Sequence, residues 1–338
     1  MSSGRYGIQP ERYRNHCVNE SLTAQWDAMD PGKVLVVSLN PAVDCEWEVE
    51  RVQWEEKNNI LRERRWAGGK GSNVARWLRH VGTEAELLVP LGGEVGKELA
   101  GYLRAAKVRT HIVWLKQPTR VNVIVTDRSG GQMRFNPLGP ILSRSEWAAV
   151  VSKLKACCCG TVIFSGALPR GVPANAYKIL IQAVRKRGAT PILDCDGAAF
   201  AGAIEAGPEL VKPNQHELEL WWQRPVKNLF QPVAALAEKT GGWVVVSRGR
   251  DGAVIWNSRM RVGFAARPPK VQIKNTVGAG DAMLAAIVRR RQICAPPEEW
   301  IRWGVAAGTA AVACEGGVLA SAEAIQKIHR QLQVRPFP

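Results

Sequence analysis

The sequence predicts an α/β fold: a doubly wound, mostly parallel sheet with helices on both faces and a small antiparallel β lid. Most of the 338 residues alternate between short apolar strands and amphipathic helices, and strands that are apolar along their whole length are typical of parallel sheets covered on both sides. Two early insertions, near residues 44–66 and 110–136, alternate apolar and polar residues instead, as strands with one solvated face do. No repeat or low-complexity linker divides the chain. We therefore expect one domain over residues 33–333, preceded by a polar extension at residues 1–32.

The first predicted strand, residues 33–41, is an apolar run that ends at Asn-Pro. Alternating stretches at residues 44–54 and 59–67 predict the first lid strands. From residue 72 to 82 the apolar period becomes helical, and Gly82 is a suitable C-terminal stop. Further strands are predicted at 85–93, within 111–136, and at 161–166, 190–195, 209–214, 242–249 and 252–256. Further helices are predicted at 96–108, 143–156, 173–188, 233–241, 279–291, 298–314 and 321–333.

The composition argues against several classes of protein. No apolar stretch is long enough to span a bilayer and the N-terminus has no apolar signal-peptide core, so we expect a cytoplasmic protein with no membrane partner. The net charge of +16 comes from Lys and Arg spread along the chain, with short clusters such as RRR at residues 289–291. Because no nucleic-acid motif accompanies them, a basic solvated surface is favoured over nucleic-acid binding. The eight cysteines include no CxxC pair and no zinc spacing, so we interpret them as reduced thiols.

The segment NTVGAGDAM, residues 275–283, joins a glycine-rich turn to the start of a helix. Gly278 and Gly280 allow backbone N–H groups to point together, and a helix N-terminus favours an anion at that place. Asp281 could there accept a proton from an attacking hydroxyl group. An aspartate at a helix start is also a common cap, and the local residues leave both interpretations open.

A second glycine-rich loop, WAGGKGSNVARWL at residues 66–78, also precedes a helix. It lacks the Walker spacing of a P-loop. Gly68, Gly69 and Gly71 allow close approach of a ligand, and Asn73 can reach hydroxyl groups from the first helical turn. A tight strand-to-helix turn without a ligand is the alternative.

These segments together resemble the ribokinase-like (pfkB) carbohydrate kinases, and within them the branch of 1-phosphofructokinase and tagatose-6-phosphate kinase. The resemblance covers about residues 33–333. One glycine loop alone would be a weak signal, whereas the ordered set is a strong one. The motifs occur in the family's order: SLNPAVD, GGKGSNVAR, TRVNVIVTD, FNPLGP, SGALPRGV, LVKPNQHELE, VVVSRGRDGAV and NTVGAGDAM.

The resemblance implies a role for each matching residue. Asp281 would be the catalytic base. The anion hole would be formed by Thr276, Gly278, Ala279 and Gly280. The sugar hydroxyls would be held by Asp44, Gly68, Gly69 and Asn73. The ATP site would include Lys212, Asn214, Ser247, Gly249 and Gly252. Asn214 and Glu217 would act on Mg²⁺ through its waters, so ATP and Mg²⁺ are the expected cofactors.

The branch assignment depends on cations for the substrate's own phosphate. Arg120 in TRVN can bind a phosphate with two parallel hydrogen bonds, and Lys57 matches a family lysine. A solvated Arg and Lys on the lid surface is the alternative.

The resemblance then implies ATP-dependent phosphorylation of a hexose phosphate. D-fructose 1-phosphate, giving fructose 1,6-bisphosphate, is the first candidate. The second is tagatose 6-phosphate or fructose 6-phosphate, phosphorylated at the 1-hydroxyl. A protein of another class, a catalytically inactive module that binds nucleic acid or sugar, is the third. The expected partners are ATP and a sugar phosphate, with a homodimer formed through the lid.

Overall fold

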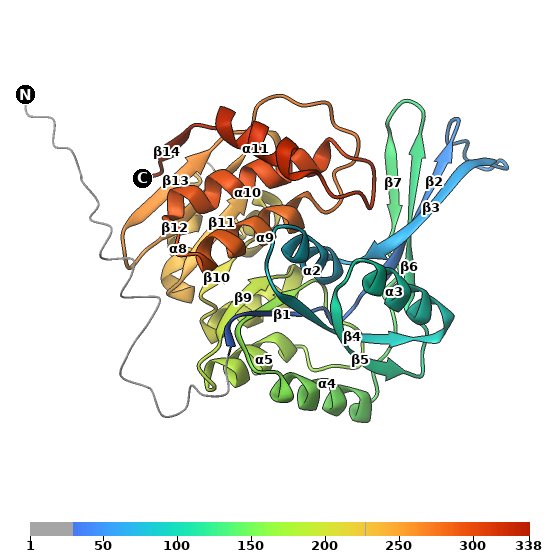
Figure 1. Ribbon diagram of the computed structural model, residues 1–338, viewed down its shortest axis with the longest axis horizontal. Helices are drawn as coiled ribbons and strands as arrows, with labels where there is room; N and C mark the ends of the chain where they lie inside the picture. Colours follow the sequence, from blue (N-terminus) through green and yellow to red (C-terminus); the bar gives the residue numbers. More distant parts are fainter. Residues whose placement is uncertain (1–29, 227) are drawn as a thin grey trace, which may run out of the picture.

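The computed structural model describes residues 30–226 and 228–338. The predicted extension, residues 1–32, therefore lies almost entirely outside the described residues. Within them, the main sheet has ten strands in the order β14-β13-β12-β11-β10-β9-β8-β1-β4-β5 (Figure 1). The strands are β1 Asp30–Val37, β4 Ala85–Gly92, β5 Arg109–Leu115, β8 Cys159–Ser165, β9 Thr190–Asp194, β10 Leu210–Val211, β11 Trp243–Ser247, β12 Ala253–Asn257, β13 Val262–Ala266 and β14 Val334–Pro336.

The main sheet is parallel from β5 to β11 and antiparallel from β11 to β14. The change of direction follows from the chain, because only residues 248–252 join β11 to β12. A parallel pair needs a crossover of a dozen or more residues, whereas a short connection makes a hairpin. The predicted mostly parallel sheet is confirmed.

Helices cover both faces of this sheet, as predicted. Alternate residues of β1 belong to different apolar clusters: Val34 and Val36 to one, Leu35 and Val37 to the other. The first cluster includes α2 Lys70–His80, α3 Gly93–Ala105, α9 Ala279–Gln292, α10 Pro297–Val312 and α11 Ala322–Gln331. The second includes α4 Arg144–Ala156, α5 Ala176–Arg185, α6 Gly197–Ala203, α7 Gln215–Trp222 and α8 Phe230–Thr240. None of the helices in the described residues is long and apolar enough to cross a bilayer.

A small sheet projects from one side of the molecule (Figure 1). In the described residues its strand order is β3-β2-β6-β7, with β2 Ala42–Val49, β3 Ile60–Gly68, β6 Arg120–Asp127 and β7 Gln132–Phe135. Two antiparallel hairpins, β2–β3 and β6–β7, are joined by a parallel pairing of β2 with β6. The strand at Arg109–Leu115, which we predicted within the second lid insertion, is instead the edge strand of the main sheet.

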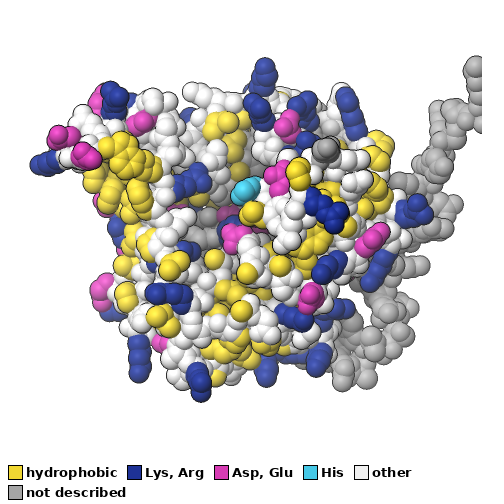
Figure 2. Space-filling model, turned by 180° about the vertical axis from the view of Figure 1, so that it is seen from behind, with side chains coloured by type: hydrophobic (Ala, Val, Ile, Leu, Met, Phe, Trp, Pro, Cys, Tyr) yellow, Lys and Arg dark blue, Asp and Glu magenta, His cyan; other side chains and the backbone are white. Residues whose placement is uncertain are grey.

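The outer surface of the small sheet is partly apolar. Trp54 is 75% exposed, and Ile60 and Leu61 are about half exposed. Figure 2 shows a hydrophobic patch on this projecting part, next to acidic and basic side chains, and a hollow in the surface beside it. The small sheet thus presents an uncovered apolar surface to solvent.

Candidate active site

The candidate site begins at the N-terminus of α9. Gly278 is the N-cap residue and has a φ of 80°, the left-handed conformation that favours glycine. No side chain caps this helix, so the first N–H groups point freely out of its first turn. The predicted anion hole, Thr276 with Gly278, Ala279 and Gly280, lies at this helix start.

Asp281 does not cap the helix. Its carboxylate accepts a hydrogen bond of 2.9 Å from Nδ2 of Asn73, and its side chain is buried. Asn73 lies in the first turns of α2, so the two glycine-rich loops of the sequence meet through this bond. The carboxylate of Asp281 therefore bonds to another helix rather than capping its own.

Burial, together with the charge of Asp194, raises the pKa of Asp281 to about 7. The hydrogen bond from Asn73 and the positive charges of Lys212 and Lys70 oppose this shift. A carboxylate in this range can both take up and release a proton near neutral pH, which is what a general base needs.

A cluster of charges surrounds Lys70. Its Nζ lies 3.2 Å from Oε1 of Glu217, 3.9 Å from Oδ1 of Asp194 and 3.8 Å from Oδ2 of Asp196. Burial lowers the pKa of Lys70, but the three carboxylates outweigh it and hold the pKa above its usual value. The buried Lys212 lies 3.3 Å from Asp194. Sequence reasoning missed Lys70 and Asp194.

Two of the predicted sugar-binding residues, Asp44 and Gly68, lie against each other. Asp44 is buried and accepts a 2.8 Å hydrogen bond from Nδ2 of Asn122. Burial raises the pKa of Asp44, opposed first by that hydrogen bond and then by the charges of Arg120 and Arg134. A Cβ atom at Gly68 would stand 2.2 Å from Cγ of Asp44. Only glycine allows the loop to pass this close to the carboxylate.

The predicted phosphate ligands, Arg120 and Lys57, are not brought together. Arg120 donates hydrogen bonds of 2.7 Å to the carbonyl of Pro137 and 2.9 Å to that of Asn40, while its buried Nε has no partner in the described residues. Lys57 is exposed in the loop between β2 and β3. Sequence reasoning missed Arg134 of β7, whose guanidinium donates a 2.7 Å hydrogen bond to Oγ1 of Thr276.

A cavity of about 470 Å³ opens beside the anion hole. Its volume is in the range of small-molecule sites. Six predicted residues line it: Ser247, Gly249, Gly252, Thr276, Ala279 and Gly280. The sequence had not indicated its largely apolar remainder: Arg250, Pro268, Pro269, Lys270, Val271, Ile273, Met283, Val305, Gly308, Thr309 and Val312. The predicted Lys212 and Asn214 do not line this cavity.

Asn214 and Glu217 form a reciprocal cap at the start of α7. Oδ1 of Asn214 accepts a 2.8 Å bond from the backbone N–H of Glu217, and Oε2 of Glu217 accepts one of 2.8 Å from the backbone N–H of Asn214. One oxygen of each side chain is therefore committed to the helix. The second carboxylate oxygen of Glu217 faces Lys70.

Comparison with known proteins decides the family. The model described as pfkB family carbohydrate kinase matches residues 32–324. The chain belongs to this pfkB family. The 1-phosphofructokinase of Bacillus subtilis (strain 168) is 29% identical over 305 residues, which cover 89% of this chain and 99% of the relative. ATP-dependent 6-phosphofructokinase isozyme 2 of Escherichia coli (strain K12) is 34% identical over 309 residues, covering 89% and 99%.

Solved structures of pfkB relatives share the fold. Phosphofructokinase-2 from Escherichia coli, in complex with substrates and products, superposes with a TM-score of 0.84 at 32% identity, covering 88% of this chain and 99% of that one. A possible 1-phosphofructokinase from Thermotoga maritima gives a TM-score of 0.81 at 25% identity, covering 90% and 100%. The resemblance inferred from the motifs is confirmed, and with it the class of enzyme, an ATP-dependent carbohydrate kinase.

Proposed function

We propose that this pfkB kinase transfers the γ-phosphoryl group of ATP to a hydroxyl group of a fructose monophosphate, giving fructose 1,6-bisphosphate. The observation that carries the proposal is the position of Asp281. It lies at the start of α9, next to the cavity of about 470 Å³, and its carboxylate is bonded to Asn73 of the sugar-side loop. A nucleotide in the cavity and a sugar beside Asn73 would meet at this carboxylate.

Each group at the helix start has a part in the transfer. Asp281 accepts the proton of the attacking hydroxyl, which makes the oxygen a better nucleophile as it approaches phosphorus. The N–H groups of Ala279 and Gly280 stabilise the charge on the phosphoryl oxygens in transit. Phosphoryl transfer asks little more of a protein than such positioning and charge neutralisation.

The residues present fit Mg²⁺ that is held mainly by the phosphates of ATP and by water. Both oxygens of buried Asp194 lack a hydrogen-bond partner in the described residues, and Glu217 lies nearby, both within 4 Å of Lys70. Mg²⁺ in phosphate-transfer sites commonly keeps several waters and takes only one or two carboxylates. No cluster of three acidic, His or Cys residues suited to holding a metal occurs in the described part of the chain. The ion would supply charge neutralisation, and Asp194 and Glu217 would orient its waters.

The acceptor has two candidates with the same product. Fructose 1-phosphate comes first, because relatives such as the Bacillus subtilis protein carry the name 1-phosphofructokinase. Fructose 6-phosphate is favoured by the higher identity, 34%, with 6-phosphofructokinase isozyme 2. The furanose ring explains the ambiguity, since C1 and C6 both project as CH₂–O groups on either side of the ring oxygen.

A coupled assay of ADP release across a panel of acceptors tests the proposal. The panel contains fructose 1-phosphate, fructose 6-phosphate, tagatose 6-phosphate, free fructose and ribose. We expect one fructose phosphate to give the highest kcat/KM. A preference for a free sugar would overturn the branch assignment. No turnover with any acceptor, together with salt-sensitive binding of DNA, would favour the inactive binding module.

The exposed apolar surface at Trp54, Ile60 and Leu61 supports the predicted homodimer through the small sheet, because uncovered apolar surface of this kind commonly marks a protein interface. The homodimer through the small sheet stays a prediction.

The pKa of Asp281 predicts how activity depends on pH. Because burial and Asp194 raise this pKa to about 7, the base is increasingly protonated and inactive below that pH. We expect kcat/KM to fall about tenfold per pH unit on the acid side of pH 7. A fall in kcat/KM that is centred near pH 6 would instead report the second ionisation of the substrate phosphate. A profile that is flat down to about pH 5 would contradict the raised pKa.

Glu217→Gln is expected to raise the Mg²⁺ concentration needed for half-maximal rate by roughly tenfold, because outer ligands of a metal contribute on this scale. Glutamine can keep the 2.8 Å bond to the backbone of Asn214 and so preserve the helix start. Glu219→Gln is the matched control, since Glu219 lies on the same helix and its carboxylate bonds only to Gln215 in the described residues. Equal metal titrations for the two variants would leave Glu217 with a capping role alone.

A further inference from the structure

A second cavity, of about 360 Å³, lies at the opposite ends of α2 and α9 from the candidate active site. It is enclosed by the C-terminal ends of α2 and α9, the middle of α10 and the first turns of α11. Arg289 and Arg290 line it from α9, His80 from the end of α2, and Trp303 from α10. The rest of the lining is mostly apolar. The sequence predicted that the basic run at residues 289–291 is solvated surface. In the structure, two of its three arginines line a cavity.

Both arginines lack an acidic partner. Within residues 30–226 and 228–338, neither guanidinium lies within ion-pair distance of a carboxylate. The nearby carboxylate, Glu299, is already engaged by Arg302 at 2.9 Å and by His329 at 2.9 Å. Burial lowers the pKa of Arg290, the charge of Glu299 partly opposes this, and the neighbouring charge of Arg289 adds to the lowering. The two guanidinium groups at one cavity therefore repel one another.

Arg290 is also held in place. Its guanidinium carbon lies 3.8 Å from the ring centroid of Trp303, a cation–π contact that restricts the side chain. Cations in the last turn of a helix also interact favourably with the helix dipole. That role requires no cavity, because Arg291 lies in the same last turn and does not line the cavity. Positioned guanidinium groups beside an apolar surface are suited to phosphate or carboxylate groups.

We propose that this cavity binds a small anion with at least two negative charges, carried on phosphate or carboxylate groups, and that its occupation is transmitted to the active site. The volume of about 360 Å³ suits a metabolite-sized ligand. The two guanidiniums supply the charge, while the aliphatic side chains, such as Val81 and Ile325, receive the carbon skeleton.

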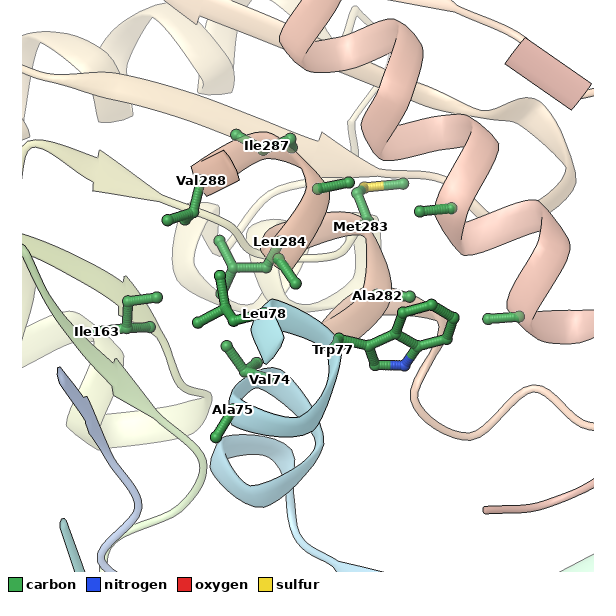
Figure 3. Packing of buried hydrophobic residues seen from close by; sticks show 14 of the residues in the cluster. Val74, Ala75, Trp77, Leu78, Ile163, Ala282, Met283, Leu284, Ile287 and Val288 are labelled. Carbon is green, nitrogen blue, oxygen red and sulfur yellow. The ribbon is translucent and has the colours of Figure 1, made fainter. Parts of the chain in front are cut away.

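The path to the active site consists of two packed helices. Figure 3 shows side chains of α2, among them Leu78, against side chains of α9, among them Leu284, and both residues belong to one buried cluster. The N-terminal turns of the same helices carry Asn73 and Asp281, which are bonded to each other at 2.9 Å. A ligand that shifts the C-terminal ends of α2 and α9 relative to one another would thus change the position of the base. Such coupling needs a ligand that binds the two arrangements with different affinity.

Calorimetric titration tests the binding site. The full chain is saturated with a non-hydrolysable ATP analogue, so that the anion hole is occupied, and is titrated in separate arms with inorganic pyrophosphate and with citrate. We expect wild type to bind at least one of these probes. Arg290→Gln should weaken that binding about tenfold or more, the effect of losing one charge-assisted hydrogen bond. Arg291→Gln removes the same charge from the same helical turn outside the cavity and should leave binding unchanged. Binding of pyrophosphate alone would indicate a phosphate ligand, and of citrate alone a carboxylate ligand.

Arg289→Gln is the second variant, because Arg289 makes no aromatic contact in the described residues and its loss spares the packing on Trp303. The proposed site would be overturned if wild type bound neither probe, or if all three variants bound the probe as tightly as wild type does. The kinetic arm measures KM for ATP and for the sugar phosphate with and without the probe that binds. If the probe changes KM in wild type and in Arg291→Gln but not in Arg290→Gln, the cavity is coupled to the active site. If the probe leaves both KM values of wild type unchanged, that part of the proposal is overturned.

Discussion

Asp281→Asn is expected to lower kcat by about two to four powers of ten, the usual contribution of a positioned general base. The asparagine oxygen can still accept the hydrogen bond that Asn73 donates to Asp281 at 2.9 Å, so the contact between α2 and α9 is kept. What the variant loses is the ability to take a proton from the acceptor hydroxyl. The affinity for ATP should barely change, because Asp281 does not line the cavity of about 470 Å³.

Steady-state kinetics with the preferred sugar phosphate, and binding of an ATP analogue, measure the two parts of this prediction. Asp127→Asn is a suitable control, since it makes the same change at a half-buried carboxylate of the small sheet, where the asparagine oxygen can still accept the hydrogen bonds that Ser129 and Gly131 donate. Near-normal turnover in Asp281→Asn would show that Asp281 is not the base and serves only to accept the hydrogen bond from Asn73. A loss of ATP binding as large as the loss of turnover would indicate a disturbed helix start.

Local periodicity predicted those elements whose faces are clearly divided. Helix α2 was predicted at 72–82, against Lys70–His80 in the structure. Helix α9, predicted at 279–291 against Ala279–Gln292, has no such divided faces, because every residue from Asp281 to Val288 is buried. Its glycine-rich start and its apolar sequence identified it instead. Helix α6, Gly197–Ala203, was missed because its seven residues are mostly Ala and Gly and show no period. Strand β14 was missed because Val334–Pro336 is defined by pairing with β13, some 70 residues earlier. Such pairing leaves no local pattern.

The residues of the candidate site also fall into two groups: those that a local motif identifies, and those whose partners are distant in the sequence. The residues in glycine-rich motifs, such as Asp281 and Gly68, could be found because each motif carries its own backbone requirement. Asp194 has no such motif, and Lys70, although it lies within the second glycine-rich loop, carries no backbone requirement of its own. The significance of both arises only where α2, β9 and α7 bring three distant carboxylates around one ammonium group. Arg134 likewise acquires a role only when β7 reaches Thr276.

Arg120→Ala is expected to raise KM for the sugar phosphate by roughly ten- to a hundredfold, because a charged hydrogen bond to phosphate contributes about 1.5 to 3 kcal/mol. Arg120→Lys should recover only part of this, since a point charge cannot reproduce two parallel bonds. The structure adds an alternative that the sequence could not show. The guanidinium of Arg120 already donates to the carbonyls of Pro137 and Asn40, at 2.7 and 2.9 Å, so the side chain also ties a loop to the end of β1.

The two roles predict different effects of Arg120→Ala on the KM for a free sugar. If Arg120 contacts the substrate phosphate, Arg120→Ala raises KM for the sugar phosphate and leaves that for free fructose unchanged, so the preference for the phosphorylated acceptor is lost. If Arg120 only holds the loop, KM rises for both acceptors together and the preference survives. Arg128→Ala is the control, because Arg128 is an exposed arginine at the β6–β7 turn that pairs with Glu50 at 3.0 Å. A normal KM for Arg120→Ala with both acceptors would exclude both roles, and the phosphate partner would then have to be sought among other cations near the small sheet, beginning with Arg134 at the anion hole.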